Sequence, residues 1–165
     1  PHLRPTADKV RQALFNMLQG SIEGKNVLDL FSGTGALGLE ALSQGAGFVT
    51  FVENNQAQAR QIHENLEKFD AAAEARVLHR DGAEALRELS EEGSYFDLIF
   101  ADPPYDLGLG LEALDVLSRS SLLHEETLII LESRKREDFP AAVGRLIRIR
   151  EKRYGDTKIS FYKLS

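Results

Sequence analysis

The chain has 165 residues, of which 42% are apolar and 28% charged, and its net charge is −6. This length predicts a single domain, residues 1–165, with a substantial hydrophobic core. The sequence contains no cysteine and its four histidines lack zinc-ligand spacing, so we expect no disulfide, no cysteine nucleophile and no metal. No apolar run approaches the roughly 20 residues that span a bilayer, and the first residues do not resemble a secretory signal. These features predict a cytoplasmic protein without a membrane partner.

The hydrophobic pattern predicts helices and strands in alternation. In chain order we expect a helix over 6–18, a strand over 26–31, a helix over 36–43, a strand over 47–53, a helix over 56–69, a strand over 75–78, a helix over 83–89, a strand over 95–101, a helix over 109–118 and a strand over 127–131. Segments 146–153 and 158–164 alternate around a turn at 154–157, which is typical of an antiparallel hairpin. The fold class is therefore α/β: a Rossmann-like sheet of seven strands, mostly parallel with a C-terminal antiparallel hairpin, and helices on both faces.

Charge is distributed unevenly along the chain. Residues 1–133 carry 10 basic and 22 acidic side chains, whereas residues 134–165 carry 10 basic and 4 acidic ones. The basic end suits a polyanionic partner, although a solvated basic face with no partner would have the same composition.

Acidic residues lie at or just after the ends of four of the predicted parallel strands, namely Asp29, Glu53, Asp81 and Asp102. Ligands of such sheets bind beyond the carboxyl ends of the strands, at the point where the strand order reverses. We therefore expect these four carboxylates to surround the binding site.

The turn after the first strand is rich in glycine. Gly33, Gly35 and Gly38 fit the pattern G-x-G-x-x-G, and Glu53 follows Gly33 by 20 residues. Both features also belong to the fingerprint of dinucleotide-binding proteins. The turn thus indicates a nucleoside-containing cofactor without saying which one.

Asp29 favours one of the two cofactor classes. A carboxylate at this place suits a cofactor whose near end is cationic, such as a methionine amino group, better than a pyrophosphate. The segment 29–35, Asp-Leu-Phe-Ser-Gly-Thr-Gly, resembles the first motif of S-adenosylmethionine-dependent methyltransferases. The resemblance implies cofactor-binding roles for Asp29, Phe31, Gly33, Thr34, Gly35, Glu53, Asn54, Asp81 and Gly82. Within this set Glu53 would hold the ribose, and Asp81 would accept from the adenine amino group, cap the next helix, or do both.

Asp102-Pro103-Pro104-Tyr105 directly follows the most apolar strand. The prolines stiffen the backbone and remove two donors, so that carbonyls and the Asp102 carboxylate form a cluster of acceptors. Such a cluster suits an amino group on a nucleobase, because acceptors on its hydrogens favour a pyramidal nitrogen and receive the departing proton. Tyr105 offers a ring for the base to stack on, worth about 1–3 kcal/mol. The tetrapeptide resembles the (Asp/Asn)-Pro-Pro-(Tyr/Phe) signature of methyltransferases that act on amino groups of adenine, cytosine or guanine, and all four residues are predicted to be catalytic.

Both ends of the chain extend this resemblance. Residues 3–18, which begin Leu-Arg-Pro-Thr, and residues 154–162, which begin Tyr-Gly-Asp-Thr, look like the RsmD-like family of bacterial 16S ribosomal RNA (guanine-N2) methyltransferases. The resemblance covers nearly the whole chain and implies that the helix within residues 1–20 packs near the cofactor pocket. It further implies substrate-binding roles for Arg4, Thr6, Tyr154, Asp156 and Thr157. The expected partner is ribosomal RNA or an assembling small ribosomal subunit, and the expected state is a monomer.

This sequence departs from the family at one place, since the family usually has a basic segment before this point and the sequence here begins at Pro1-His-Leu-Arg4. Three other functions are weighed against the expected one. A DNA or other RNA amino methyltransferase would share the catalytic residues, and a DNA enzyme normally needs a further recognition domain. An NAD-dependent dehydrogenase would leave Asp102 to Tyr105 without a role, and a non-catalytic RNA-binding module would not need the acidic pocket.

Overall fold

The structure is a computed structural model that describes residues 5–104 and 108–165, with side chains from residue 7 onward. Its helices are α1 (Pro5–Met17), α2 (Ala36–Ser43), α3 (Gln56–Lys68), α4 (Gly82–Glu91) and α5 (Leu109–Arg119), with a 3-10 turn η1 (Ala72–Glu74). Its strands are β1 (Asn26–Leu30), β2 (Phe48–Val52), β3 (Ala75–Leu78), β4 (Phe96–Ala101), β5 (Leu123–Arg134), β6 (Ala142–Val143), β7 (Leu146–Tyr154) and β8 (Thr157–Leu164).

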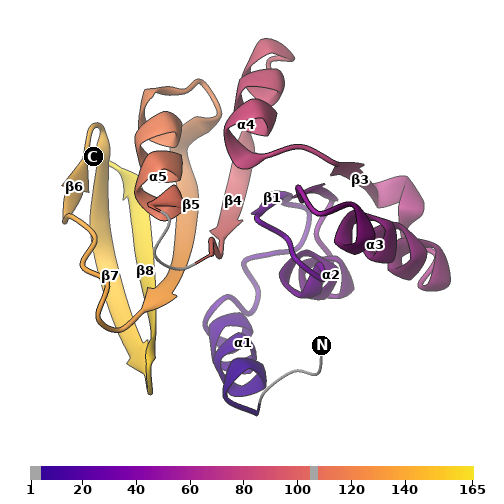
Figure 1. Cartoon of the computed structure of the whole chain (residues 1–165), viewed down its shortest axis with the longest axis horizontal. Coiled ribbons are helices and arrows are strands. Elements are labelled where there is room, and N and C mark those ends of the chain that lie inside the picture. Colours follow the sequence, from indigo (N-terminus) through magenta and orange to yellow (C-terminus); the bar gives the residue numbers. More distant parts are fainter. Residues whose placement is uncertain (1–4, 105–107) are drawn as a thin grey trace.

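All the described strands form one sheet in the order β3-β2-β1-β4-β5-β8-β7-β6 (Figure 1). Strands β1 to β5 are parallel, and β8 joins β5 antiparallel and forms a hairpin with β7. The α/β Rossmann-like fold is therefore confirmed, with the C-terminal antiparallel hairpin. The expected count of seven strands is wrong by one, because Ala142 and Val143 pair with β7 as an extra edge strand. A two-residue strand is too short to show an alternating pattern in the sequence.

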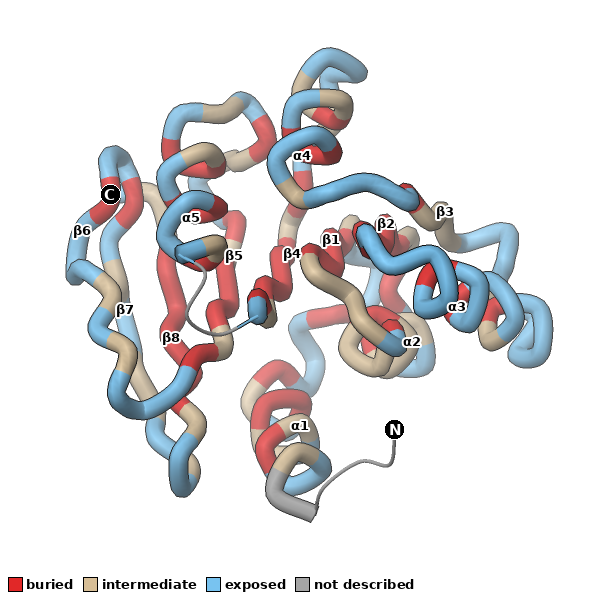
Figure 2. The backbone as a smooth tube through the Cα atoms, in the orientation of Figure 1, coloured by how far each residue is buried: buried red, intermediate tan, exposed pale blue. Residues whose placement is uncertain are grey.

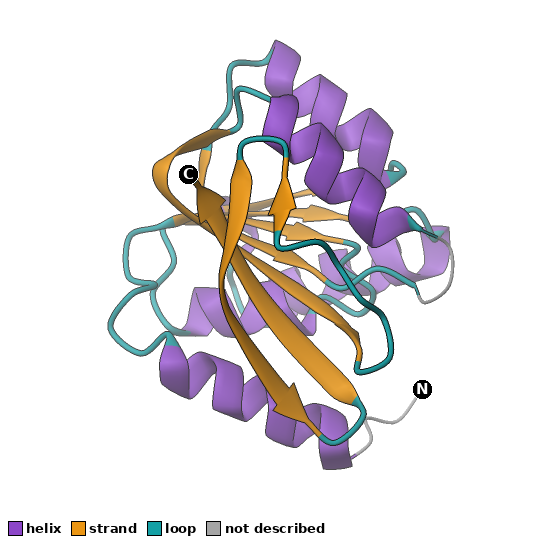
Figure 3. Ribbon diagram, turned by 90° about the vertical axis from the view of Figure 1, so that its left-hand side faces the viewer, coloured by secondary structure: helices purple, strands orange, loops and turns teal. Residues whose placement is uncertain are grey.

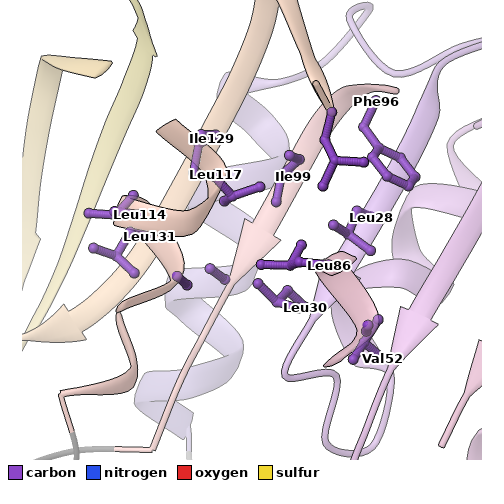
Figure 4. Packing of buried hydrophobic residues seen from close by; sticks show 14 of the residues in the cluster. Leu28, Leu30, Val52, Leu86, Phe96, Ile99, Leu114, Leu117, Ile129 and Leu131 are labelled. Carbon is purple, nitrogen blue, oxygen red and sulfur yellow. The ribbon is translucent and has the colours of Figure 1, made fainter. Parts of the chain in front are cut away.

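Helices cover both faces of the sheet (Figure 3). Helices α4 and α5 pack Leu86, Leu89, Leu114 and Leu117 onto one face, in the core shown in Figure 4. Helices α1, α2 and α3 pack onto the other face. Burial follows the same layers, since the central strands are buried along most of their length and the outer helix surfaces are exposed (Figure 2). None of the described helices is long and apolar enough to cross a membrane.

The strand order reverses between β1 and β4. After β3 the chain crosses to the other side of β1 and continues outward through β4 and β5. In the shared register Leu30 lies opposite Ala101, and Ala101 lies opposite Leu131. The residues that follow these three strand positions therefore meet at the switch point, where such sheets bind their ligands.

Candidate active site

A cavity of about 760 Å³ opens at the carboxyl ends of β1 to β4, beside α4 and α5. Its volume lies within the range of roughly 300–1,000 Å³ that is usual for small-molecule sites. The sequence-predicted residues that line it are Phe31, Gly33, Glu53, Asn54, Asp81, Gly82, Asp102, Pro103 and Pro104. The fold thus brings together residues from four separate loops.

Glu53 ties the glycine turn to the end of β2. Its side chain is 7% exposed, and its Oε1 accepts the backbone N–H of Gly33 at 2.7 Å. Its Oε2 accepts the backbone N–H of Asn55 at 2.9 Å. Each carboxylate oxygen has a second lone pair, so Glu53 can accept hydroxyl hydrogens from a ligand while these two contacts hold it in place.

Phe31 forms one wall of the cavity in a rare backbone conformation. Its φ of 62° is unusual for a residue other than glycine, and such conformations cluster at ligand sites. Its ring faces Gly82, where an added Cβ would lie 3.3 Å from two ring carbons. The glycine at position 82 therefore lets the start of α4 approach the ring closely.

Asp81 caps helix α4. Its Oδ1 accepts the backbone N–H of Glu84 at 2.8 Å, and the residue is exposed at the rim of the cavity. The capping role that the sequence allowed is therefore confirmed. Because the cap uses Oδ1, Oδ2 is available to accept from a ligand, and that second role stays a prediction.

Asp29 lies behind the cavity wall and not on its surface. The side chain is 1% exposed, and Oδ2 accepts the backbone N–H of Gly38 at 3.0 Å. Burial, together with the charge of Glu53, raises the pKa of Asp29 from 3.8 to about 8, although the bond from Gly38 acts in the opposite direction. A cation close to this buried carboxyl would favour its ionised form.

Asp102 directly follows β4 and lines the cavity, and it is followed by the buried Pro103 and the exposed Pro104. Burial raises the pKa of Asp102 well above its usual range, and the charges of Glu132 and Asp29 raise it further. Three carboxylates from adjacent strands therefore share one low-dielectric region, which disfavours full ionisation and favours a bound cation.

Glu132 was missed by the sequence analysis, which ended the fifth strand at Leu131. In the structure β5 continues to Arg134, and Glu132 is partly buried next to Asp102. The signal was present in the sequence, because Glu132 follows the last residue of an apolar run as Asp102 does. Cavity-lining residues Asn55, Gln58, Arg80 and Glu112 were also not predicted.

Five predicted residues lie away from the cavity. Thr34 is exposed and Gly35 is buried in the turn before α2. The Tyr154 hydroxyl lies 3.7 Å from the sulfur of Met17 in α1. Asp156 accepts the N–H of Lys135 through its carbonyl, and Thr157 pairs with Arg134. The turn at 154–157 is therefore beside the carboxyl end of β5, two residues beyond Glu132.

The remaining predicted residues fall outside the described part. Arg4 and Tyr105 are not described, and of Thr6 only the helical backbone is. No described side chain of α1 lines the cavity. The helix packs its apolar side against the sheet face formed in part by Phe100 and Ile159, so its expected place near the cofactor stays a prediction.

The charges around the cavity suit a cationic cofactor. Among the described lining residues four are acidic, and the single basic one, Arg80, is bonded to Glu88 and to the carbonyl of His79. A pyrophosphate would meet repulsion there, whereas a sulfonium and an ammonium group would be attracted. Residues 5–104 and 108–165 contain no group of three His, Asp or Glu side chains arranged to hold a metal ion.

Comparisons with known proteins agree with this geometry. A family model described as "Conserved hypothetical protein 95" matches residues 1–163. The chain is 37% identical over 163 residues to ribosomal RNA small subunit methyltransferase D of Escherichia coli K12, covering 99% of this chain and 80% of that protein. It is 37% identical over 134 residues to the protein of the same name from Haemophilus influenzae, covering 81% and 69%.

Solved structures agree as well. A conserved hypothetical protein of Streptococcus pyogenes superposes with a TM-score of 0.85 at 32% identity, covering 94% of this chain and 95% of that one. The 16S rRNA N2 G1207 methyltransferase of Thermus thermophilus, solved with AdoMet and guanosine, superposes with a TM-score of 0.79 over 99% of this chain and 44% of that one. Its identity of 24% supports the shared fold alone.

Together with these relatives, the fold and the site define a methyltransferase. Within that class the chain belongs to the RsmD family, whose model matches almost its entire length.

Proposed function

We propose that this protein transfers the methyl group of S-adenosylmethionine to the exocyclic amino group, N2, of a guanine in 16S ribosomal RNA. The observation that carries the proposal is that Asp102 and Pro103 line the same cavity as Glu53 and Asp81. The names of the most similar relatives support small-subunit ribosomal RNA as the substrate. Guanine N2 is what the resemblance of Asp102 to Tyr105 and of the chain ends implies.

Glu53, Asp81, Phe31 and Gly82 would hold the nucleoside part of the cofactor, and Asp29 would lie toward its cationic end. When bound, S-adenosylmethionine supplies an electrophilic methyl carbon on a positively charged sulfur. The chain's own contribution is to hold the acceptor nitrogen in line with that carbon and to exclude water.

Asp102 accepts a hydrogen of the target amino group and takes up the proton that leaves as the new bond forms. In the free protein its raised pKa favours the protonated carboxyl, which cannot take a proton. A cation in the cavity favours the ionised form. Transfer should therefore accelerate as pH rises through the pKa of Asp102.

Ribosomal RNA or an assembling small ribosomal subunit is the proposed partner. Basic side chains of β7, among them Arg150 and Lys152, would face its phosphates, and the affinity would fall with salt as these contacts are screened. A DNA or other RNA amino methyltransferase remains the alternative that shares every catalytic residue. The cytoplasmic location and the monomeric state stay predictions.

Titration calorimetry with S-adenosylmethionine and, separately, with NADH tests the cofactor. Transfer of a labelled methyl group to 16S ribosomal RNA and to small subunits then tests the reaction. Asp102→Ala should abolish transfer and keep most of the cofactor affinity, because the partners of Asp102 are on the base. The matched control is Asp115→Ala, whose exposed carboxylate pairs with Arg119 on α5. Binding of NADH alone, or near-normal turnover by Asp102→Ala, contradicts the proposal.

A further inference from the structure

In the proposed reaction the segment Asp102-Pro103-Pro104 binds an exocyclic amino group, and three of the nucleobases carry such a group. What differs between them is the ring nitrogen beside that group. In adenine and cytosine this neighbour (N1 or N3) is an acceptor with a lone pair, whereas in guanine N1 carries a hydrogen and is a donor. A protein that reads the Watson–Crick edge of an extruded base can therefore distinguish guanine by placing a second acceptor beside the first.

Glu132 lies on the strand next to β4, close enough to Asp102 for its charge to act on that carboxyl. Ala101 of β4 and Leu131 of β5 are register partners in adjacent parallel strands. Asp102 directly follows β4, and Glu132 is the next residue of β5. Adjacent strands lie about 4.8 Å apart. Because Ala101 and Leu131 both face the core under α4 and α5, Asp102 and Glu132 both face the opposite side of the sheet.

The electrostatics agree with this geometry. After burial, the charge of Glu132 is the largest influence that raises the pKa of Asp102, ahead of Asp29 on the other neighbouring strand. When both carboxyls are ionised they only accept, so together they match a pair of adjacent N–H donors.

We propose that Glu132 is a specificity-determining residue that accepts the N1–H of the target guanine while Asp102 accepts a hydrogen from N2. The inference rests on the proposed function, because it names a contact within the same reaction. With adenine or cytosine at the same place, the Glu132 carboxylate would face a ring lone pair, and these two acceptors repel each other. A site built to accept a hydrogen from its substrate rejects an analogue that lacks this hydrogen.

Glu132→Gln tests this role, because the amide has nearly the same shape and adds a donor. The target guanine is first located by mapping the methyl group in 16S ribosomal RNA treated with the wild-type protein. An RNA with 2-aminopurine at that position is then prepared by ligation. This base keeps the 2-amino group and has an acceptor at N1, so it presents the amino group without the N1–H.

The quantity to measure is the ratio of kcat/KM for the guanine RNA to that for the 2-aminopurine RNA. The wild-type protein should prefer guanine strongly. Glu132→Gln should lower that preference by about tenfold or more, because the amide N–H₂ donates to the N1 lone pair of 2-aminopurine. Glu132→Ala should also lower it, without the new donor. Glu126→Gln, an exposed change at the other end of β5, should leave the ratio unchanged.

Cofactor affinity, measured by calorimetry, shows whether each variant has kept its fold. A variant that binds S-adenosylmethionine normally and keeps the wild-type preference overturns the role of Glu132 and leaves the proposed function standing. If the wild-type protein methylates no guanine of the RNA, the proposed function fails first, and the inference fails with it. The two failures are therefore distinguishable.

Discussion

Replacing Asp29 by asparagine is expected to change how the stability of the free protein depends on pH. The carboxyl of Asp29 is 1% exposed, and burial raises its pKa from 3.8 to about 8. Asparagine has nearly the same shape, carries no charge at any pH, and keeps an oxygen that can accept from Gly38. The substitution therefore removes the titration and leaves most of the packing intact.

The sign of the effect follows from proton linkage. Because the pKa of Asp29 is higher in the folded than in the unfolded state, the folded state binds more protons between pH 3.8 and about 8. The contribution to stability is fully present below the unfolded pKa and is lost as pH rises through the folded pKa. Between about pH 6 and about pH 9 this single group should cost the wild-type protein about 2–3 kcal/mol.

Urea unfolding at these two pH values measures the effect. Asp29→Asn should lose less stability than the wild-type protein over the interval, by the amount just given, and should be the more stable of the two at alkaline pH. Asp115→Asn makes the same chemical change at an exposed helix position and should behave like the wild type. Equal pH slopes for Asp29→Asn and the wild type would refute a buried, protonated Asp29. We also expect Asp29→Asn to weaken S-adenosylmethionine binding, since it removes a negative charge near the cationic end.

Three further substitutions test the packing of α2 on the sheet, the binding of the cofactor and the stability contributed by a contact away from the site. Gly38→Ala should lower the free energy of unfolding by about 1–3 kcal/mol, because the added Cβ clashes with the ring of Phe51; an equally stable variant in urea would show that the ring can move aside. Glu53→Gln should weaken cofactor binding about tenfold or more in calorimetry, because a charged acceptor is lost, and an unchanged affinity would remove Glu53 from the site. Asp97→Ala breaks a 2.7 Å contact with His124 near the amino ends of β4 and β5, away from the cavity. It should cost about 1–3 kcal/mol of stability, with no change in the transfer rate of the folded protein.

Much of the fold could be predicted because its signals are local. The strand 95–101 and the helix 36–43 each show their period within a few residues, and the structure confirms them as β4 and α2. Several residues that line the cavity could also be predicted. Strand ends at the switch point are recognisable in a sequence, so the convergence of Glu53 and Asp102 could be expected from their positions along the chain.

What could not be predicted depends on contacts between distant segments. The bond from Gly38 to Asp29 is set by the packing of α2 on β1, and no short pattern indicates that Asp29 lies behind the cavity wall. The position of Glu132 after an apolar run is visible in the sequence, but its place beside Asp102 is set by the register of β5 with β4. The pairing of Ala142 with Ile147 likewise arises only after β7 has joined the sheet.

The contact between Tyr154 and Met17 joins two ends of the chain that are 137 residues apart. Helix α1 also packs in one core cluster with Ile159 and Phe161 of β8, the last strand to be synthesised. During translation the first helix therefore lacks part of its packing surface until nearly the whole chain has been made. Because contacts between distant segments slow folding, we expect the native structure to form late, and a chain that stops before β8 to remain without a firmly packed α1.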